Sequence, residues 1–67
     1  MSVAKVTEIT SSSTKSFEDA LQAGISRAAK TLDNVQNAWI QDHEVVVENG
    51  KITEYKVRMK VTFVLKD

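Results

Sequence analysis

Apolar and polar residues alternate almost without interruption between Tyr55 and Leu65. One set of alternate positions holds Tyr55, Val57, Met59, Val61, Phe63 and Leu65, and the other holds Lys56, Arg58, Lys60 and Thr62. Because successive side chains of a strand point to opposite faces of a sheet, this pattern predicts a strand with one buried and one exposed face.

Residues Ala38–Leu65 are predicted to form a β-hairpin that turns at Asn49-Gly50. A type I′ turn needs positive φ at both of its central residues, and Asn-Gly is the dipeptide most typical of it. A two-residue loop at this place also fixes which residues of the two strands face each other.

The register of this hairpin decides where the only tryptophan lies. Counting from the turn places Ile40 opposite Met59 on the apolar face and Trp39 opposite Lys60 on the polar face. A β-bulge that shifts the pairing by one residue would instead turn Trp39 into the core. The irregular pattern of residues 42–47 allows such a bulge, so both orientations stay open, and the outward one is favoured.

The first part of the chain predicts a strand and then a loop. Val3–Thr10 is rich in β-branched residues, which favour strands. Ser11–Thr14 consists of small hydroxyl residues and is predicted to be a loop. Ser16 is the candidate N-cap of the element that follows, with Glu18 and Asp19 placed favourably for the helix dipole.

A helix is predicted from about Phe17 to Leu32, ending at Asp33-Asn34, where Asn can adopt the left-handed conformation. Gly24 costs a helix about 1 kcal/mol relative to alanine, so its place on the packed stripe indicates a close approach to the sheet or to another subunit. The apolar stripe at i, i+3, i+4 spacing consists of Phe17, Ala20, Leu21, Gly24, Ile25, Ala28 and Leu32.

These elements predict an α+β fold of order β-α-β-β, in which a three-stranded antiparallel sheet packs on a single helix. Residues 1–67 form one domain. One helix covers one face of such a sheet and leaves the other open, with Trp39 standing on it. A small domain avoids large exposed aromatic surface, so we expect another subunit or a flat ligand to cover this face.

Composition narrows the function classes. The chain has no cysteine and one histidine, which excludes disulfides, thiolate zinc sites and histidine-rich metal sites. Oligomerisation is then the expected source of extra stability for so small a domain. A formal net charge of zero argues against a strongly electrostatic nucleic-acid or membrane binder. The N-terminus lacks the apolar segment of a signal peptide, so a cytoplasmic protein is expected.

Trp39 is the main candidate binding residue. Its indole is suited to stacking on a planar ligand ring, and the alternative is a core or interface tryptophan under a lysine. Lys56, Arg58 and Lys60 form a basic row beside it. With Trp39 this row could bind a nucleic acid, but a solvated face paired with Glu54 and neighbouring carboxylates is favoured.

Catalysis and metal binding are not expected. His43 has no partner at a catalytic or metal-ligand spacing, which favours a structural or solvent-facing histidine. Asp42, Glu44 and Glu48 do not follow the spacing of an EF-hand loop. The chain has two glycines and no glycine-rich phosphate loop.

The chain as a whole resembles the dodecins, small flavin-binding proteins of bacteria and archaea. The residues that carry the resemblance are Val3–Val6, Ser26–Leu32, Trp39, Tyr55–Val57 and Lys60–Phe63. The resemblance implies a sheet wrapped around one helix and a hollow homododecamer. It also implies flavins that are bound in antiparallel pairs between tryptophans of two subunits, and it assigns this role to Trp39.

The resemblance implies two further flavin contacts, one of them altered. Many members have a glutamine on the last strand that contacts the flavin ring, and this chain has Lys56 at that position. An amide donates and accepts hydrogen bonds, whereas an ammonium group only donates them. Glu44 lies where many members have an acidic residue near the ribityl chain, and Val46 where many bacterial members have arginine. Some members also bind coenzyme A, a possible ligand here.

Three candidate functions follow, two from this resemblance and one from the basic row beside Trp39. The first is storage or sequestration of a flavin (FMN, riboflavin or FAD) by a homododecamer that is not an enzyme. The second is a dodecin-like shell that has lost flavin binding because of Lys56. The third, which is less favoured, is a nucleic-acid-binding module.

Overall fold

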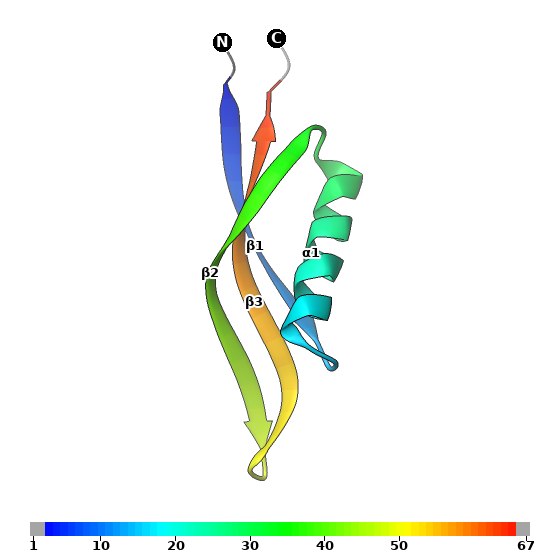
Figure 1. The fold of residues 1–67 in the computed structure, drawn as a ribbon, viewed down its shortest axis with the longest axis vertical. Helices are drawn as coiled ribbons and strands as arrows, with labels where there is room; N and C mark the ends of the chain where they lie inside the picture. The colour runs from blue at the N-terminus through cyan, green and yellow to red at the C-terminus, as the bar shows by residue number, and fades with distance from the viewer. Residues whose placement is uncertain (1–2, 66–67) are drawn as a thin grey trace.

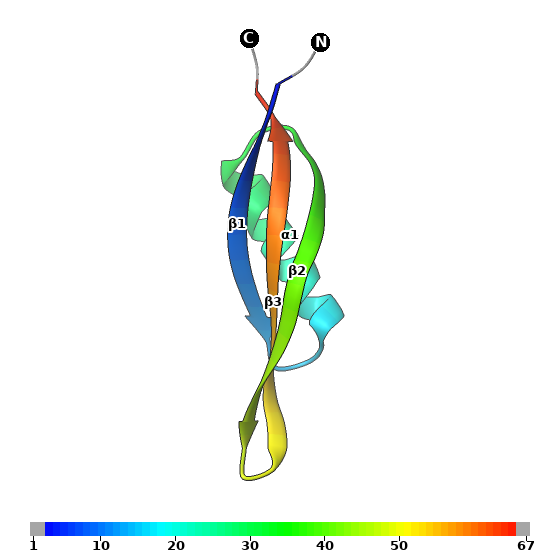
Figure 2. The same cartoon turned by 90° about the vertical axis from the view of Figure 1, so that its left-hand side faces the viewer.

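The computed structural model describes residues 3–65, and its elements follow the order β-α-β-β. Strand β1 spans Ala4–Ser13, helix α1 spans Phe17–Thr31, strand β2 spans Val35–Glu48 and strand β3 spans Lys51–Val64. The strands form one antiparallel sheet in the order β1-β3-β2, and α1 lies against one face of it (Figure 1, Figure 2). The predicted fold class is therefore confirmed. The strand order, with the last strand in the centre, was not predicted from the sequence.

The predicted loop at Ser11–Thr14 is wrong for its first three residues. Strand β1 continues through Ser13, which pairs with Tyr55 of β3. Ser11 faces the helix, and its small side chain leaves room for Gly24, where an added Cβ would lie 2.9 Å from the Cβ of Ser11. Pairing with β3 and close packing under α1 thus outweigh the turn preference of serine.

Helix α1 begins at the predicted residue and ends at Thr31, one residue before the predicted Leu32. The hydroxyl oxygen of Ser16 accepts a hydrogen bond of 3.0 Å from the backbone N–H of Asp19, which caps the first turn. Asn34 adopts the left-handed conformation beyond the helix, with φ of 59°. An added Cβ at Gly24 would also lie 2.8 Å from Cε of Met59, so the predicted close approach of helix and sheet is confirmed.

The core lies between α1 and the central strand. Ala20, Val57, Met59 and Val61 retain no exposed surface there. Ile40 pairs with Met59 as predicted but remains 42% exposed. β3 ends at Val64, so Leu65, which the alternation places on the apolar face, lies beyond the strand and is 45% exposed.

The β2–β3 hairpin protrudes beyond the rest of the molecule. Asn49 and Gly50 have φ of 51° and 76°, which confirms the predicted turn with two positive φ angles. The turn lies at one end of a molecule 51 Å long, past the last residue of β1 and the first turn of α1 (Figure 1). Residues 45–54, which we call the hairpin tip, therefore form a two-stranded ribbon.

Candidate functional site

The face of the sheet opposite α1 is not covered by any described part of the chain, and we call it the open face. Figure 2 shows the three strands in front of the helix. Pairing and alternation place these side chains on the open face: Glu8, Thr10 and Ser12 from β1; Trp39, Asp42 and Glu44 from β2; and Lys56, Arg58 and Lys60 from β3.

Trp39 lies on the open face, as the register predicts. It pairs with Lys60, next to the pair of Ile40 and Met59, so both predicted pairs are confirmed. Trp39 is 49% exposed and is not among the residues that pack against the core. The alternative of a tryptophan beneath its own helix is thereby excluded for the single chain.

Two bulges that cancel maintain this orientation. Thr53 is an extra residue in β3, and its hydroxyl donates a hydrogen bond of 3.3 Å to the carbonyl oxygen of Val46. Gln41 is an extra residue in β2. The first bulge shifts the pairing by one position and the second restores it, so Trp39 returns to the face that an unbulged hairpin would give it.

The residues of β2 between the two bulges have other cross-strand partners, and face the other side of the sheet, than they would in an unbulged hairpin. Asp42 pairs with Arg58, and Glu44 pairs with Lys56. Without the shift, both carboxylates would lie opposite apolar positions of β3 on the helix side. The bulges therefore place two acidic side chains on the open face, beside the basic row.

Arg58 is held by both of these carboxylates, and we call the three residues the arginine clamp. Its Nε donates to Oδ1 of Asp42 at 2.7 Å, and its Nη2 donates to Oε1 of Glu44 at 3.0 Å. These contacts raise the pKa of Arg58 above its usual value. The hydrogen bond with Asp42 contributes most, and the hydrogen bond with Glu44 contributes next. The clamp thus fixes a planar cation close to Trp39.

Sequence reasoning expected the basic row to be paired but did not identify this clamp. It named Glu54 as a partner, yet Glu54 forms no ion pair within residues 3–65. The sequence signal was present, since Asp42 and Glu44 are two residues apart, as are Lys56 and Arg58. The signal could be used only once the bulges were known.

Lys56 lies on the same face as Trp39, as predicted. Glu44 is its direct cross-strand neighbour, but the carboxylate of Glu44 bonds to Arg58 instead. In the part of the chain that the structure describes, Lys56 has no ion-pair partner. Lys60, the partner of Trp39, lies four positions further along β3, or about 13 Å along the strand. Its ammonium group is thus available to a ligand at some distance from the indole.

His43 lies on the other face and does not join this site. Its ring stacks on Phe17 with centroids 4.5 Å apart and an interplanar angle of 22°. Phe17 in turn meets Tyr55 edge to face at 5.1 Å. A structural role for His43, one of the two roles favoured from the sequence, is therefore supported by the contact.

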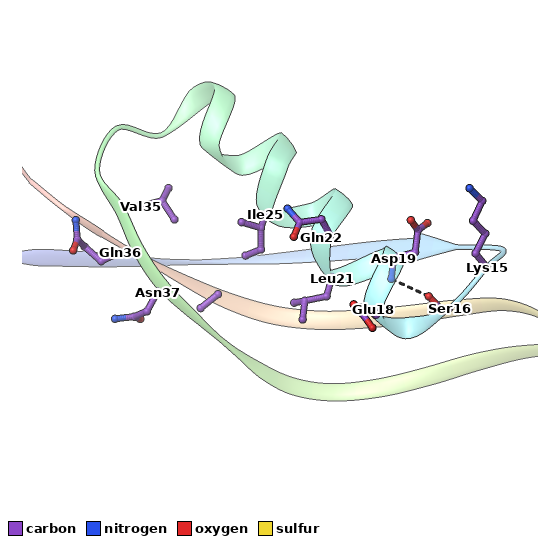
Figure 3. Close-up of a pocket in the computed structure, with 11 residues that line it drawn as sticks. Lys15, Ser16, Glu18, Asp19, Leu21, Gln22, Ile25, Val35, Gln36 and Asn37 are labelled. Carbon is purple, nitrogen blue, oxygen red and sulfur yellow. Dashed lines mark hydrogen bonds between the residues drawn. The ribbon is translucent and has the colours of Figure 1, made fainter.

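A groove of about 790 Å³ separates α1 from the first part of β2 (Figure 3). Leu21, Ile25, Val35 and Ala38 form its apolar floor, and polar side chains at both ends and edges form its rim. Glu18 and Asp19 belong to the rim near the helix N-terminus, together with Lys15. This groove, which we call the helix–strand groove, lies on the helix side of the sheet, away from Trp39.

The sequence model of the dodecin family matches residues 3–66, which is nearly the whole chain. This protein belongs to the dodecin family. Calcium dodecin of Mycobacterium tuberculosis is 33% identical over 67 residues, which cover 98% of this chain and 93% of the relative. The family consists of small binding and storage proteins that assemble as multimers.

Solved dodecin structures share the fold closely. Dodecin from Streptomyces davaonensis superposes with a TM-score of 0.93 at 30% identity, over 98% of this chain and 97% of the other. A variant of Thermus thermophilus dodecin gives a TM-score of 0.94 at 28% identity, over the full length of both chains. The β-α-β-β arrangement is thus the fold of these dodecins.

The described residues do not form a metal site of their own. Residues 3–65 contain no group of three or more histidine, aspartate or glutamate side chains placed to hold a metal ion. Asp42 and Glu44, the carboxylates nearest to Trp39, are bonded to Arg58. In the same range, no helix has the length and apolar character needed to cross a membrane.

Proposed function

We propose that this protein binds a flavin (FMN, riboflavin or FAD) between the Trp39 rings of two subunits of a homododecamer, and that it stores or sequesters the flavin without transforming it. The observation that carries the proposal is the half-exposed indole on a sheet face that its own helix does not cover. Membership of the dodecin family supports the choice of flavin as the planar ligand.

A single indole covers only one side of an isoalloxazine ring. A second copy of the open face, related by a two-fold axis, supplies the second indole and buries the exposed aromatic surface of both chains. Each offset-stacked contact adds about 0.5–1.5 kcal/mol beyond the burial of area. Close stacking on an electron-rich indole also quenches the excited state of the flavin, which protects the cell from light-driven reactions of free flavin.

The polar residues of the open face fit a flavin in part. Lys56 has a free ammonium group that can donate to the ring carbonyls but leaves the ring N–H without an acceptor. Glu44 is the candidate for the ribityl hydroxyls, and it must then share its carboxylate with Arg58. The open face therefore suits a stacked flavin, but Lys56 binds the polar edge of the ring less well than a glutamine amide at the same position would.

The alternative shell without flavin differs from this proposal in one property, the affinity of the open face for a planar ring. The nucleic-acid module is less supported, because the arginine clamp neutralises the central cation of the basic row. Calcium binding, which the name of the mycobacterial relative indicates for that protein, has no supporting cluster of three or more acidic or histidine side chains within residues 3–65.

Titration of purified apoprotein with riboflavin or FMN tests the proposal. We expect flavin fluorescence to be quenched at micromolar protein, and the quenching to be lost in Trp39→Ala. Trp39→Phe keeps a smaller ring and should retain part of it. Val6→Ala, a change at another exposed apolar position of the open face, is the matched control and should leave the titration unchanged.

Unchanged flavin fluorescence would reject the flavin proposal and favour the shell without flavin. The same titration in the presence of calcium chloride separates the two ligands, because a flavin site made by Trp39 needs no cation. Light scattering tests the assembly separately. Twelve chains of 7.5 kDa give a particle of about 90 kDa.

A further inference from the structure

Three cations of β3 share the open face and follow one another along the strand. Lys60, Arg58 and Lys56 are each two residues apart, or about 7 Å. Trp39 pairs with Lys60, and Asp42 pairs with Arg58. The pair of Arg58 and Asp42 therefore lies between the indole and Lys56. The proposed function uses the two ends of this row and leaves its middle unassigned.

A flavin that stacks on Trp39 and reaches Lys56 must cover the middle of the row. An indole has two fused rings and an isoalloxazine has three, so one ring of the flavin extends beyond the indole. When the polar edge of the flavin points towards Lys56, this ring lies above Arg58, the residue between the two ends. The long side chain of Lys56 then turns its ammonium group back to the ring carbonyls.

The contacts of Arg58 leave the flat sides of its guanidinium group free. Its Nε donates to Asp42 and its Nη2 donates to Glu44, and such hydrogen bonds lie in the plane of the group. Both carboxylates lie along β2, and Arg58 reaches them from β3, so these contacts favour a plane that runs along the surface of the sheet. The side chain of Arg58 is 36% exposed. A guanidinium plane in this position is suited to stacking on a ring.

The charge of Arg58 does not oppose burial beneath a ring. An unpaired cation loses its hydration when it is covered, which is costly, whereas a cation that is hydrogen-bonded to carboxylates keeps its partners. Asp42 forms the shorter of the two contacts, at 2.7 Å. It therefore holds Arg58 even when Glu44 turns to the ribityl hydroxyls. Lys56 and Lys60 cannot take this role, because an ammonium group is not planar.

We infer that Arg58 is a second stacking residue of the flavin site, next to Trp39, and that Asp42 is the positioning residue that fixes its plane. The inference rests on the proposed function and extends it to the class of ligand. A platform made of an indole and a guanidinium group is longer than an indole alone, and it matches three fused rings better than two. The open face therefore selects isoalloxazines over bicyclic pteridines with the same ribityl chain.

Two ligands that differ by one ring test the inference. Purified apoprotein is titrated with riboflavin and with dimethyl-ribityllumazine, a fluorescent pteridine that carries the same ribityl chain on two fused rings. We expect the wild type to bind riboflavin about fivefold more tightly than the lumazine. Arg58→Met should bind riboflavin about fivefold more weakly than the wild type does and the lumazine almost equally, so that the preference is lost.

Two further variants separate the plane of Arg58 from its charge and its position. Arg58→Lys keeps the charge without the plane, so it should lose the preference as fully as Arg58→Met. Asp42→Asn weakens the contact that fixes the plane, and the preference should fall by about half. Arg27→Met is the matched control. It removes an arginine of α1, on the other side of the sheet, and should leave both titrations unchanged.

The ratio of the two affinities distinguishes stacking from a structural role. If Arg58→Met loses affinity for both ligands alike, Arg58 only shapes the open face, and the inference is overturned. An unchanged ratio in Arg58→Met and in Arg58→Lys would overturn it as well. Exposed ion pairs add little to stability, so the far-UV spectra should match that of the wild type, and Arg58→Lys covers the case in which Arg58→Met does not fold.

Failure of the inference and failure of the proposed function give different results. A wild type that quenches riboflavin with no dependence on Arg58 rejects the second stacking residue and leaves the flavin site at Trp39 standing. A wild type that quenches neither ligand rejects the flavin site itself, and the inference with it.

Discussion

On the helix side of β3, Val57, Met59 and Val61 retain no exposed surface, whereas Lys56, Arg58 and Lys60 between them remain partly exposed on the open face. The two sets share one strand and one backbone. The first set is held by packing against α1. The second is arranged by the pairing with β2, and one of its members by two ion pairs.

This difference separates stability from binding. Burial of apolar side chains supplies most of the free energy of folding, so the helix side must be filled without gaps. Exposed ion pairs add little, so the open face is free to vary in charge as long as its register is kept. Substitutions on the two faces should therefore be measured by different experiments.

The largest effect is expected from Met59→Ala. Truncation of a fully buried methionine lowers the free energy of unfolding by about 2–5 kcal/mol, through lost transfer energy and a residual cavity. Lys60→Ala, at the next residue on the open face, should change it by no more than about 0.5 kcal/mol. Urea denaturation of both variants measures the comparison. Equal losses would contradict the assignment of stability to the helix side.

A smaller effect, seen in binding and not in stability, is expected from Lys56→Gln. The amide supplies the acceptor that the ammonium lacks, and an unpaired buried donor costs about 1–3 kcal/mol. We therefore expect riboflavin to bind about tenfold more tightly, with the unfolding curve unchanged. Lys30→Gln, which removes the same charge in the last turn of α1, is the control. Equal or weaker riboflavin binding by Lys56→Gln would remove Lys56 from the flavin site.

Close contact between helix and sheet predicts a still smaller effect for Gly24→Ala. The better helix propensity of alanine favours folding by about 1 kcal/mol, but the new Cβ would lie 2.9 Å from the Cβ of Ser11. Overpacking of this kind costs about 1–3 kcal/mol, so the net loss should be about 1 kcal/mol. In a Ser11→Gly background, the same change should become neutral or stabilising in a double-mutant cycle. A loss that persists there would place the strain elsewhere.

Residues governed by local patterns could be predicted from the sequence. The alternation of β3, the capping role of Ser16, the turn at Asn49-Gly50 and the contact of Gly24 are each set by a few neighbouring residues. The end of β1 could not be predicted, because serine has little strand preference of its own. Ser11–Ser13 are extended since β3 offers them partners.

The candidate site was predicted in position but not in its interactions. Trp39 lies on the expected face only because the bulges at Gln41 and Thr53 cancel. The number and positions of bulges cannot be predicted from a single sequence. The same bulges place Asp42 and Glu44 beside Arg58. In an unbulged register, these two carboxylates would lie on the helix side. Pairing between distant residues thus determines the electrostatics of the open face.

The smallest effect on stability is expected at the arginine clamp, where the chemistry differs most from the helix side. Arg58→Met removes both exposed ion pairs of the clamp and Asp42→Asn removes one of them, so each should lower Tm by at most a few degrees at low salt. Their combination should lower it by less than the sum, because both remove the same contact. In about 1 M salt the effects should shrink, since screening weakens exposed charges, whereas the effect of Met59→Ala should persist. Thermal melts of the wild type, the two single variants, their combination and Met59→Ala at two salt concentrations measure this. A loss in Arg58→Met as large and as salt-independent as that in Met59→Ala would mean that packing also holds the open face, and the distinction between the two faces would then fail.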